Sequence, residues 1–173
     1  MPTSYLLKNL PTRRDLATLG RMYPIPDVSA VETFFSLLGV AGDVLSSTNS
    51  QMAKHKTSFG KIRVLAQLVR QPDQRLTPCE LAKRIGVTRA TVTGLLDGLE
   101  KCGYLRREGS REDRRSVSVH LLPAGRRFLE TVMPDRFRHM AKIMTRLNRQ
   151  ERNVLQKLLI KVAEGVAEAG RNR

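Results

Sequence analysis

Three arginines lie close together in the segment GSREDRR, which covers residues 109–115. Arg111, Arg114 and Arg115 give this short loop more positive charge than a solvated turn requires. The planar guanidinium group binds phosphate and guanine edges through paired hydrogen bonds, and it also enters narrow minor grooves. Asp113 can orient a neighbouring arginine by a charge-assisted hydrogen bond. The chemistry that these residue types offer is recognition of a polyanion.

A second group of candidate residues lies upstream, between Thr88 and Gly94. Thr91 and Thr93 are small hydroxyl donors suited to phosphates or base edges, and Arg89 suits a phosphate or a guanine edge. Small neighbours allow a helix to approach DNA closely. The residues expected to contact DNA in a groove are Thr88, Arg89, Ala90, Thr91, Thr93 and Gly94.

Two short helices with strong capping signals must position the second group. Residues Thr77–Glu80 form a capping box with proline at the first helical position. We predict a helix to about Ile85, a left-handed turn at Gly86, and a second helix over about 89–101 that Thr88 caps. The second helix has an inward apolar stripe at helical spacing, made of Val92, Leu95, Leu96 and Leu99.

A β-hairpin must present the arginine loop. We predict its strands at 104–108 and 116–121, with a third short strand at 75–76. The alternation of the second strand turns Val117, Val119 and Leu121 to the core and Ser116, Ser118 and His120 to solvent. Two helices followed by a hairpin is the order of a winged helix-turn-helix, which binds double-stranded DNA. The alternative is a structural helix pair with no ligand.

The segment Leu81–Gly125 resembles the DNA-binding lobe of the MarR (multiple-antibiotic-resistance-regulator) family. The matching pieces are the run 99–105 (LEKCGYL), the run 113–117 (DRRSV) and the run 121–125 (LLPAG), in which Pro123 stands where the family usually has threonine. The resemblance implies that Arg115 contacts the minor groove or backbone and that Asp113 helps to hold the wing. It also implies a mainly α fold with a small β-hairpin wing and a helical dimerisation region.

We divide the chain into an N-terminal extension (1–26), a winged helix-turn-helix lobe (57–122) and a helical dimerisation region (27–56 and 123–173). Outside the lobe, helices are predicted at about 12–22, 28–54, 59–70, from 123 with a kink or interruption at Pro134, and at 149–169. Their apolar stripes exceed what a small core can bury. We therefore expect a homodimer on a palindromic site, with recognition helices roughly 34 Å apart. Alternatively, these helices wrap the core of a single chain.

Composition supports a polyanionic partner. The 173 residues carry a formal net charge of +15, and residues 83–127 contain 11 basic and 5 acidic side chains. A high positive charge can also reflect only solubility or genome composition. Aromatic residues make up 5% of the chain and there is no tryptophan, which disfavours a base-stacking surface for single strands or RNA. A non-specific architectural DNA-binding protein remains the alternative to a regulator.

The sequence argues against an enzyme, a cofactor or a metal site. It has no glycine-rich phosphate loop and no Ser/His/Asp order, and its three histidines and two cysteines are scattered. No stretch approaches the roughly 20 apolar residues of a membrane span, so no membrane partner is expected. Pro11 and the pair 13–14 interrupt any signal-peptide core, so we expect a cytoplasmic protein.

The resemblance also implies a small effector, often a phenol or an aromatic acid, that releases the DNA. In this chain the candidate ligand residues are Phe35, His55, Phe59 and Arg63. His55 and Arg63 could pair with an anion, or they could be surface or DNA-facing charges. Cys79 lies in the first turn of a predicted helix, where the dipole favours a thiolate, so redox sensing through Cys79 is a further alternative.

Overall fold

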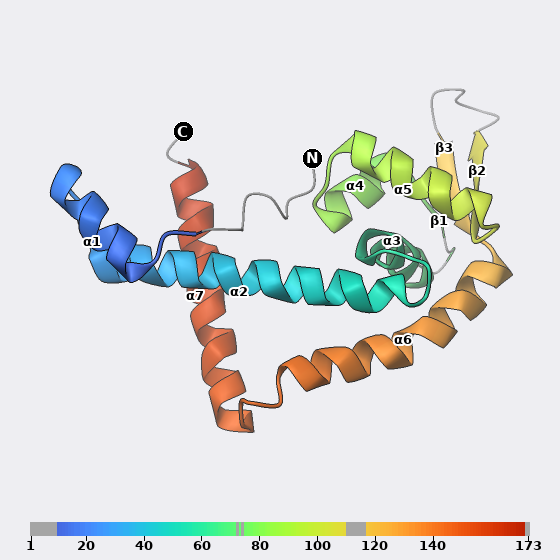
Figure 1. Ribbon diagram of the computed structural model, residues 1–173. Helices are drawn as coiled ribbons and strands as arrows, with labels where there is room; N and C mark the ends of the chain where they lie inside the picture. Colours follow the sequence, from blue (N-terminus) through green and yellow to red (C-terminus); the bar gives the residue numbers. More distant parts are fainter. Residues whose placement is uncertain (1–9, 72, 74, 110–116, 172–173) are drawn as a thin grey trace. The chain divides into compact units, whose positions relative to one another are not determined.

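The computed structural model describes residues 10–71, 73, 75–109 and 117–171. In chain order the elements are α1 (Arg13–Met22), α2 (Val28–Ala53), α3 (Phe59–Val69), β1 (Arg75–Leu76), α4 (Pro78–Ile85), α5 (Arg89–Lys101), β2 (Leu105–Gly109), β3 (Val117–Leu121), α6 (Pro123–Ile143) and α7 (Arg149–Arg171) (Figure 1). The chain divides into two units, one up to Met133 and one from Pro134. The predicted class, mainly α with a small antiparallel sheet, is confirmed.

Local side-chain signals set where the helices begin, as the sequence indicates. The Asp27 carboxylate accepts from the Ala30 N–H at 2.9 Å and caps α2. Ser58 caps α3, and its hydroxyl accepts from the Lys61 N–H. Helix α7 begins with a reciprocal pair, because Asn148 N–H donates to the Glu151 carboxylate while Glu151 N–H donates to the Asn148 side chain.

Of the kink or interruption predicted at Pro134, the interruption is wrong, because helix α6 continues through this residue. Proline lacks the N–H that would donate to the carbonyl four residues earlier, and the loss of this hydrogen bond is the reason for the prediction. Its fixed φ is nevertheless helical, so the surrounding backbone hydrogen bonds can carry the helix past one missing bond. The two units of the chain meet in sequence at this residue.

A single apolar core joins α3, α4 and α5 to a three-stranded sheet of order β1-β3-β2. Both pairings are antiparallel, and the central Val119 faces Leu76 on one side and Arg107 on the other. Its side chain is completely buried. The core residues with the largest fully buried side chains are Leu65, Leu68, Leu81, Ile85, Leu96, Leu99 and Leu105. A smaller cluster of Met52, Ile62 and Val132 lies beside it.

The strands differ from prediction by about one residue. Strand β2 begins at Leu105 rather than Tyr104, and Ser116 lies outside the described residues. The inward position of Val119 is confirmed. His120 is less exposed than predicted, with 23% of its side chain accessible, because its ring lies 3.2 Å from the Glu108 carboxylate on β2.

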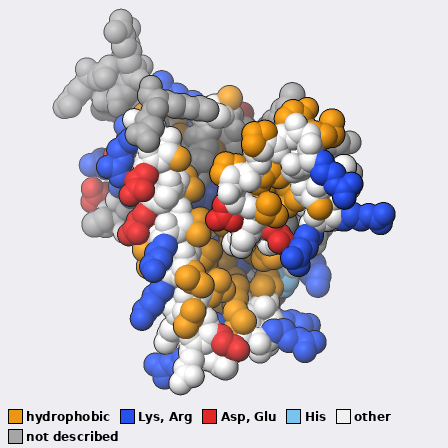
Figure 2. Space-filling view, turned by 90° about the vertical axis from the view of Figure 1, so that its left-hand side faces the viewer, with side chains coloured by type: hydrophobic (Ala, Val, Ile, Leu, Met, Phe, Trp, Pro, Cys, Tyr) orange, Lys and Arg blue, Asp and Glu red, His pale blue; other side chains and the backbone are white. Residues whose placement is uncertain are grey.

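Two long helices leave apolar surface uncovered. Helix α2 is long and apolar enough to span a membrane by length and composition alone, with a mean hydropathy of 1.5 over its best window. This corrects the expectation that no stretch approaches that length. None of that window is buried, and α7 likewise has no buried residue. Figure 2 shows hydrophobic side chains on the surface of one face, interspersed with Lys and Arg side chains.

Gly125 allows the first turn of α6 to pack against the wing sheet. A β-carbon at this position would overlap the carbonyl oxygen of Tyr104 and lie 3.0 Å from the Leu121 side chain. The Tyr104 carbonyl also accepts from the Leu122 N–H at 3.0 Å, and the Tyr104 ring stacks on Phe128. The backbone therefore cannot move away without loss of these contacts.

We expect Gly125→Ala to lower the free energy of unfolding by about 1–3 kcal/mol, because overpacking against backbone cannot be relieved by a side-chain rotation. Gly94→Ala is the matched control, since a β-carbon at Gly94 meets nothing within 4 Å. That control should gain roughly 0.5–1 kcal/mol from helix propensity. Urea unfolding followed by circular dichroism measures both, and equal values for the two variants would contradict the packing argument.

Candidate nucleic-acid interface

The turn between α4 and α5 is built by local signals that the sequence predicts. Thr77 N–H donates to the Glu80 carboxylate at 2.8 Å, and Glu80 N–H donates back to the Thr77 hydroxyl at 3.2 Å. The first of these bonds is the main cause of the lowered pKa of the Glu80 carboxyl. Gly86 ends α4 at φ +64°, in the left-handed region that favours glycine. Thr88 then caps α5 by accepting from the Thr91 N–H.

The two faces of α5 are sharply different. Val92, Leu96 and Leu99 are each at most 1% exposed and fix the inner face against the core. The structure exposes all six residues that were predicted to contact DNA, and it brings them together at one end of the helix: Thr88, Arg89, Ala90, Thr91, Thr93 and Gly94. Because a buried face fixes the rotation of a helix, this exposed face has a defined direction.

The threonine hydroxyls on this face already bond within the helix. The hydroxyls of Thr88 and Thr91 lie 2.9 Å apart, and the Thr93 hydroxyl donates to the Arg89 carbonyl at 3.0 Å. This refines the prediction that both threonines act as donors. In this arrangement the Thr93 hydroxyl offers acceptor lone pairs, and the helix bond holds the orientation of its methyl group.

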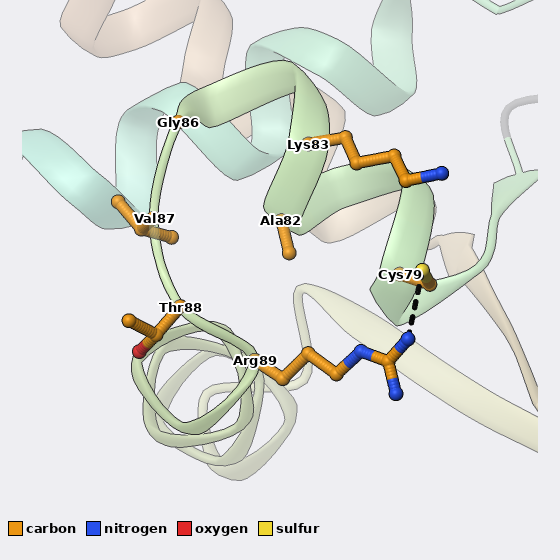
Figure 3. A pocket seen from close by; sticks show the side chains of 7 residues that line it. All are labelled: Cys79, Ala82, Lys83, Gly86, Val87, Thr88 and Arg89. Atoms are coloured by element: carbon orange, nitrogen blue, oxygen red, sulfur yellow. Dashed lines mark hydrogen bonds between the residues drawn. The ribbon is translucent and has the colours of Figure 1, made fainter. Parts of the chain in front are cut away.

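A surface hollow of about 570 Å³ lies beside the same end of α5, between it and α4. The side chain of Arg89 extends across this hollow toward Cys79, and one guanidinium nitrogen lies 3.6 Å from the sulfur (Figure 3). Lys83 adds a second positive charge to the lining. The hollow therefore combines two cations and a free thiol next to the exposed face.

Sequence reasoning missed an ion-pair cluster at the other end of α5. Arg107 on β2 contacts the carboxylates of Glu100 and Asp97 at 2.6 and 2.7 Å. Hydrogen bonds from the Arg107 guanidinium, and then from its backbone N–H, hold the pKa of the Glu100 carboxyl below its ordinary value. The pKa of Arg107 is raised, chiefly by the same bond to Glu100. The Asp97 carboxylate thus joins the recognition-helix candidate α5 to a strand of the sheet.

The predicted wing contacts lie outside the described residues. These are Arg111, Asp113, Arg114 and Arg115. Strands β2 and β3, which flank them, form a regular antiparallel pair from Leu105↔Leu121 to Gly109↔Val117. The DNA contacts of these four residues remain predictions.

The structure brings together only part of the predicted effector site. The Arg63 guanidinium lies 5.6 Å from the centre of the Phe59 ring, one turn earlier on α3. Phe35 on α2 makes an edge contact with Phe34, and His55 follows the end of α2. All four side chains are partly exposed, and other residues line the two surface hollows found near α4, α5 and β2.

Among the described residues, no three His, Cys, Asp or Glu side chains come close enough together to hold a metal ion. Cys79 is partly exposed and Cys102, at the end of α5, is exposed; both are free thiols. The hollow beside α5 therefore offers guanidinium, ammonium, hydroxyl and thiol groups from Arg89, Lys83, Thr88 and Cys79.

Comparison with known proteins decides the family. A model of the MarR family matches residues 57–116, a range that contains α3, β1, the capped helices α4 and α5, and β2. The chain is also 34% identical to the HTH-type transcriptional repressor YetL of Bacillus subtilis over 153 residues, which are 88% of this chain and 92% of that protein. The chain belongs to the MarR family. Because this is a family of transcriptional regulators, the predictions of a DNA-binding regulator and of no enzyme activity are confirmed.

Solved structures show the same fold. Sco3205, a MarR family transcriptional regulator from Streptomyces coelicolor in complex with DNA, is 24% identical, with a TM-score of 0.74 over 83% of this chain and 91% of that chain. BpsR of Bordetella bronchiseptica is 25% identical, with a TM-score of 0.61 over 69% of this chain and 84% of that chain. Its structure concerns the regulation of DNA binding by 6-hydroxynicotinic acid.

Proposed function

We propose that this MarR family regulator is a homodimeric, ligand-responsive repressor that binds a palindromic operator through α5 and the wing. The observation that carries the proposal is the small, exposed face of α5, whose direction is fixed by a fully buried opposite face. Thr88, Arg89, Ala90, Thr91, Thr93 and Gly94 lie against the major groove, and Arg111, Asp113, Arg114 and Arg115 serve the flanking wing contact. Such a regulator acts on DNA in the cytoplasm.

The uncovered apolar faces support the homodimer. Helix α7 has exposed apolar side chains along its length, including Val154, Leu158 and Val162, each more than 40% accessible. Burial of such a stripe lowers the free energy of the protein in water. In a symmetric dimer the same stripe of a second copy can cover it. We therefore assign the helical dimerisation region to 27–56 and 123–173, as the sequence predicts. A symmetric pair presents two copies of α5 to two half-sites, which requires a palindrome.

The effector part of the proposal is an aromatic or phenolic acid near α2 and α3. The paired Phe59 and Arg63 offer an apolar ring and a cation, which suit an aromatic anion. BpsR, whose DNA binding 6-hydroxynicotinic acid regulates, supports this chemical class. Phe35 and His55 are the remaining candidate contacts.

The first experiment measures binding of the purified protein to the DNA upstream of its own gene, against excess scrambled duplex, at two salt concentrations. A specific regulator should prefer its site by a factor of about 10³ or more and lose affinity steeply with salt. Equal binding to both duplexes would favour a non-specific architectural protein and contradict the repressor assignment.

A graded series of variants, Gly94→Ala and Gly94→Leu, tests whether α5 contacts the DNA groove. Space around Gly94 is open and the residue lies on the exposed face of α5, so neither variant should lower stability. If the helix enters the groove, the larger side chain should cost more than about 1.4 kcal/mol of operator binding, which is tenfold in affinity. Unchanged affinity for Gly94→Leu would place the groove contact elsewhere.

The homodimer is tested on α7. Leu158→Glu should shift the mass in sedimentation velocity from twice 19.5 kDa to 19.5 kDa, because a charge would be buried in the interface. Gln156→Glu adds the same charge two residues away and should leave the dimer intact. A dimer that survives Leu158→Glu would show that α7 does not form the interface.

A second candidate function, redox sensing, is favoured by the contact between Cys79 and Arg89. Peroxide oxidises a thiol to a sulfenic acid with release of water, and a larger polar group there would displace a DNA-contacting guanidinium. We expect peroxide to weaken operator binding of Cys102→Ser, which keeps Cys79, and to spare Cys79→Ser. An equal response of both variants would rule out sensing at Cys79.

A further inference from the structure

Arg107 ties the strand that leads into the wing to two successive turns of the recognition helix. Its Nε and Nη2 donate to one Glu100 carboxylate oxygen at 2.9 and 2.6 Å, and its backbone N–H donates to the other oxygen at 2.8 Å. The same Nη2 also donates to Asp97, one turn earlier on α5, at 2.7 Å. One residue of β2 is thus held through both its side chain and its backbone.

These bonds leave Arg107 poorly placed to bind phosphate. Its side chain is 30% exposed, and a phosphate would have to compete with two carboxylates that already occupy the guanidinium. The cluster has more negative than positive charge. Arg106, the preceding residue on β2, is 58% exposed and pairs with Glu108 on its own strand instead. The two adjacent arginines therefore have different environments.

The contacts of Arg107 with Glu100 and Asp97 are a second direct attachment between α5 and β2. The first is the turn at Gly103, where Gly103 N–H donates to the Glu100 carbonyl at 2.8 Å and Tyr104 N–H donates to the Leu99 carbonyl at 3.1 Å. Pairing with β3 and the buried side chain of Leu105 hold β2 in the sheet. The Arg107 contacts lie three residues beyond Tyr104 and hold the strand directly against the helix at a point closer to the wing.

We propose that Arg107 is a positioning residue that makes the recognition helix and the wing bind DNA as one rigid body. The inference rests on the proposed function, since it requires that both α5 and the wing contact the same duplex. It assigns to Asp97 and Glu100 a role in DNA affinity although both are acidic. When two contacts already have the correct relative geometry before binding, less conformational entropy is lost when the complex forms.

The sign of an affinity change tests the proposal. Asp97→Asn and Glu100→Gln each remove a negative charge from a DNA-binding lobe, and simple electrostatics predicts tighter binding. The positioning role predicts the opposite, a loss of at least about fivefold, because the strand is released. The probe is a duplex that the unmodified protein selects from a random-sequence DNA library. Circular dichroism at the assay temperature confirms folding, and Asp97→Asn is the milder variant if Glu100→Gln unfolds.

Arg106→Gln is the matched control for Arg107→Gln. Both variants remove one positive charge from the same strand, but only the second breaks the contacts to α5. We expect Arg107→Gln to bind the duplex at least about fivefold more weakly than Arg106→Gln. The slope of log affinity against log salt should equal that of the unmodified protein, since no phosphate contact is lost.

The outcomes distinguish failure of the positioning role from failure of the proposed function. Equal or tighter binding by the folded Asp97→Asn protein, or a salt slope lowered by about one in Arg107→Gln, would overturn the positioning role while the regulator assignment stands. If the unmodified protein selects no preferred duplex, the proposed function itself fails and takes the inference with it.

Discussion

Burial of the inner face of α5 is the constraint on which the rest of this molecule depends. Val92, Leu96 and Leu99 fill the core between α3, α4 and the sheet, and together they allow only one rotation of the helix about its axis. Every other feature of the candidate interface follows from that rotation. It decides that the small residues face outward, that Arg89 crosses toward Cys79, and that Asp97 and Glu100 reach the strand behind the helix.

The sequence predicts well what is decided within a few residues. The caps at Thr12, Asp27, Thr77, Thr88 and Asn148 each join a side chain to a backbone group three residues away, so spacing alone reveals them. The glycine turn and the inward stripe of α5 are equally local. These features are enough to predict α5 and its exposed face from the sequence.

What the sequence does not reveal depends on residues brought together by the sheet and the core. To predict the pairing of Arg107 with Asp97 and Glu100, one must know which side of β2 faces α5. The partial burial of His120 depends on the register of β3 against β2. At Pro134 the helix continues although the local rule allows an interruption, because the backbone hydrogen bonds around the proline keep the helix intact.

The lack of buried side chains in α7 links the stability of this helix to the concentration of the protein. A helix of 23 residues with no buried side chain gains little stability from its own chain, since most helical stability in proteins comes from packing of an apolar face. If a second copy supplies that packing, the melting temperature must rise with protein concentration by mass action. The order of the C-terminal helix would then report how many copies of the regulator a cell holds, and a regulator that represses its own gene would be least ordered when it is scarcest.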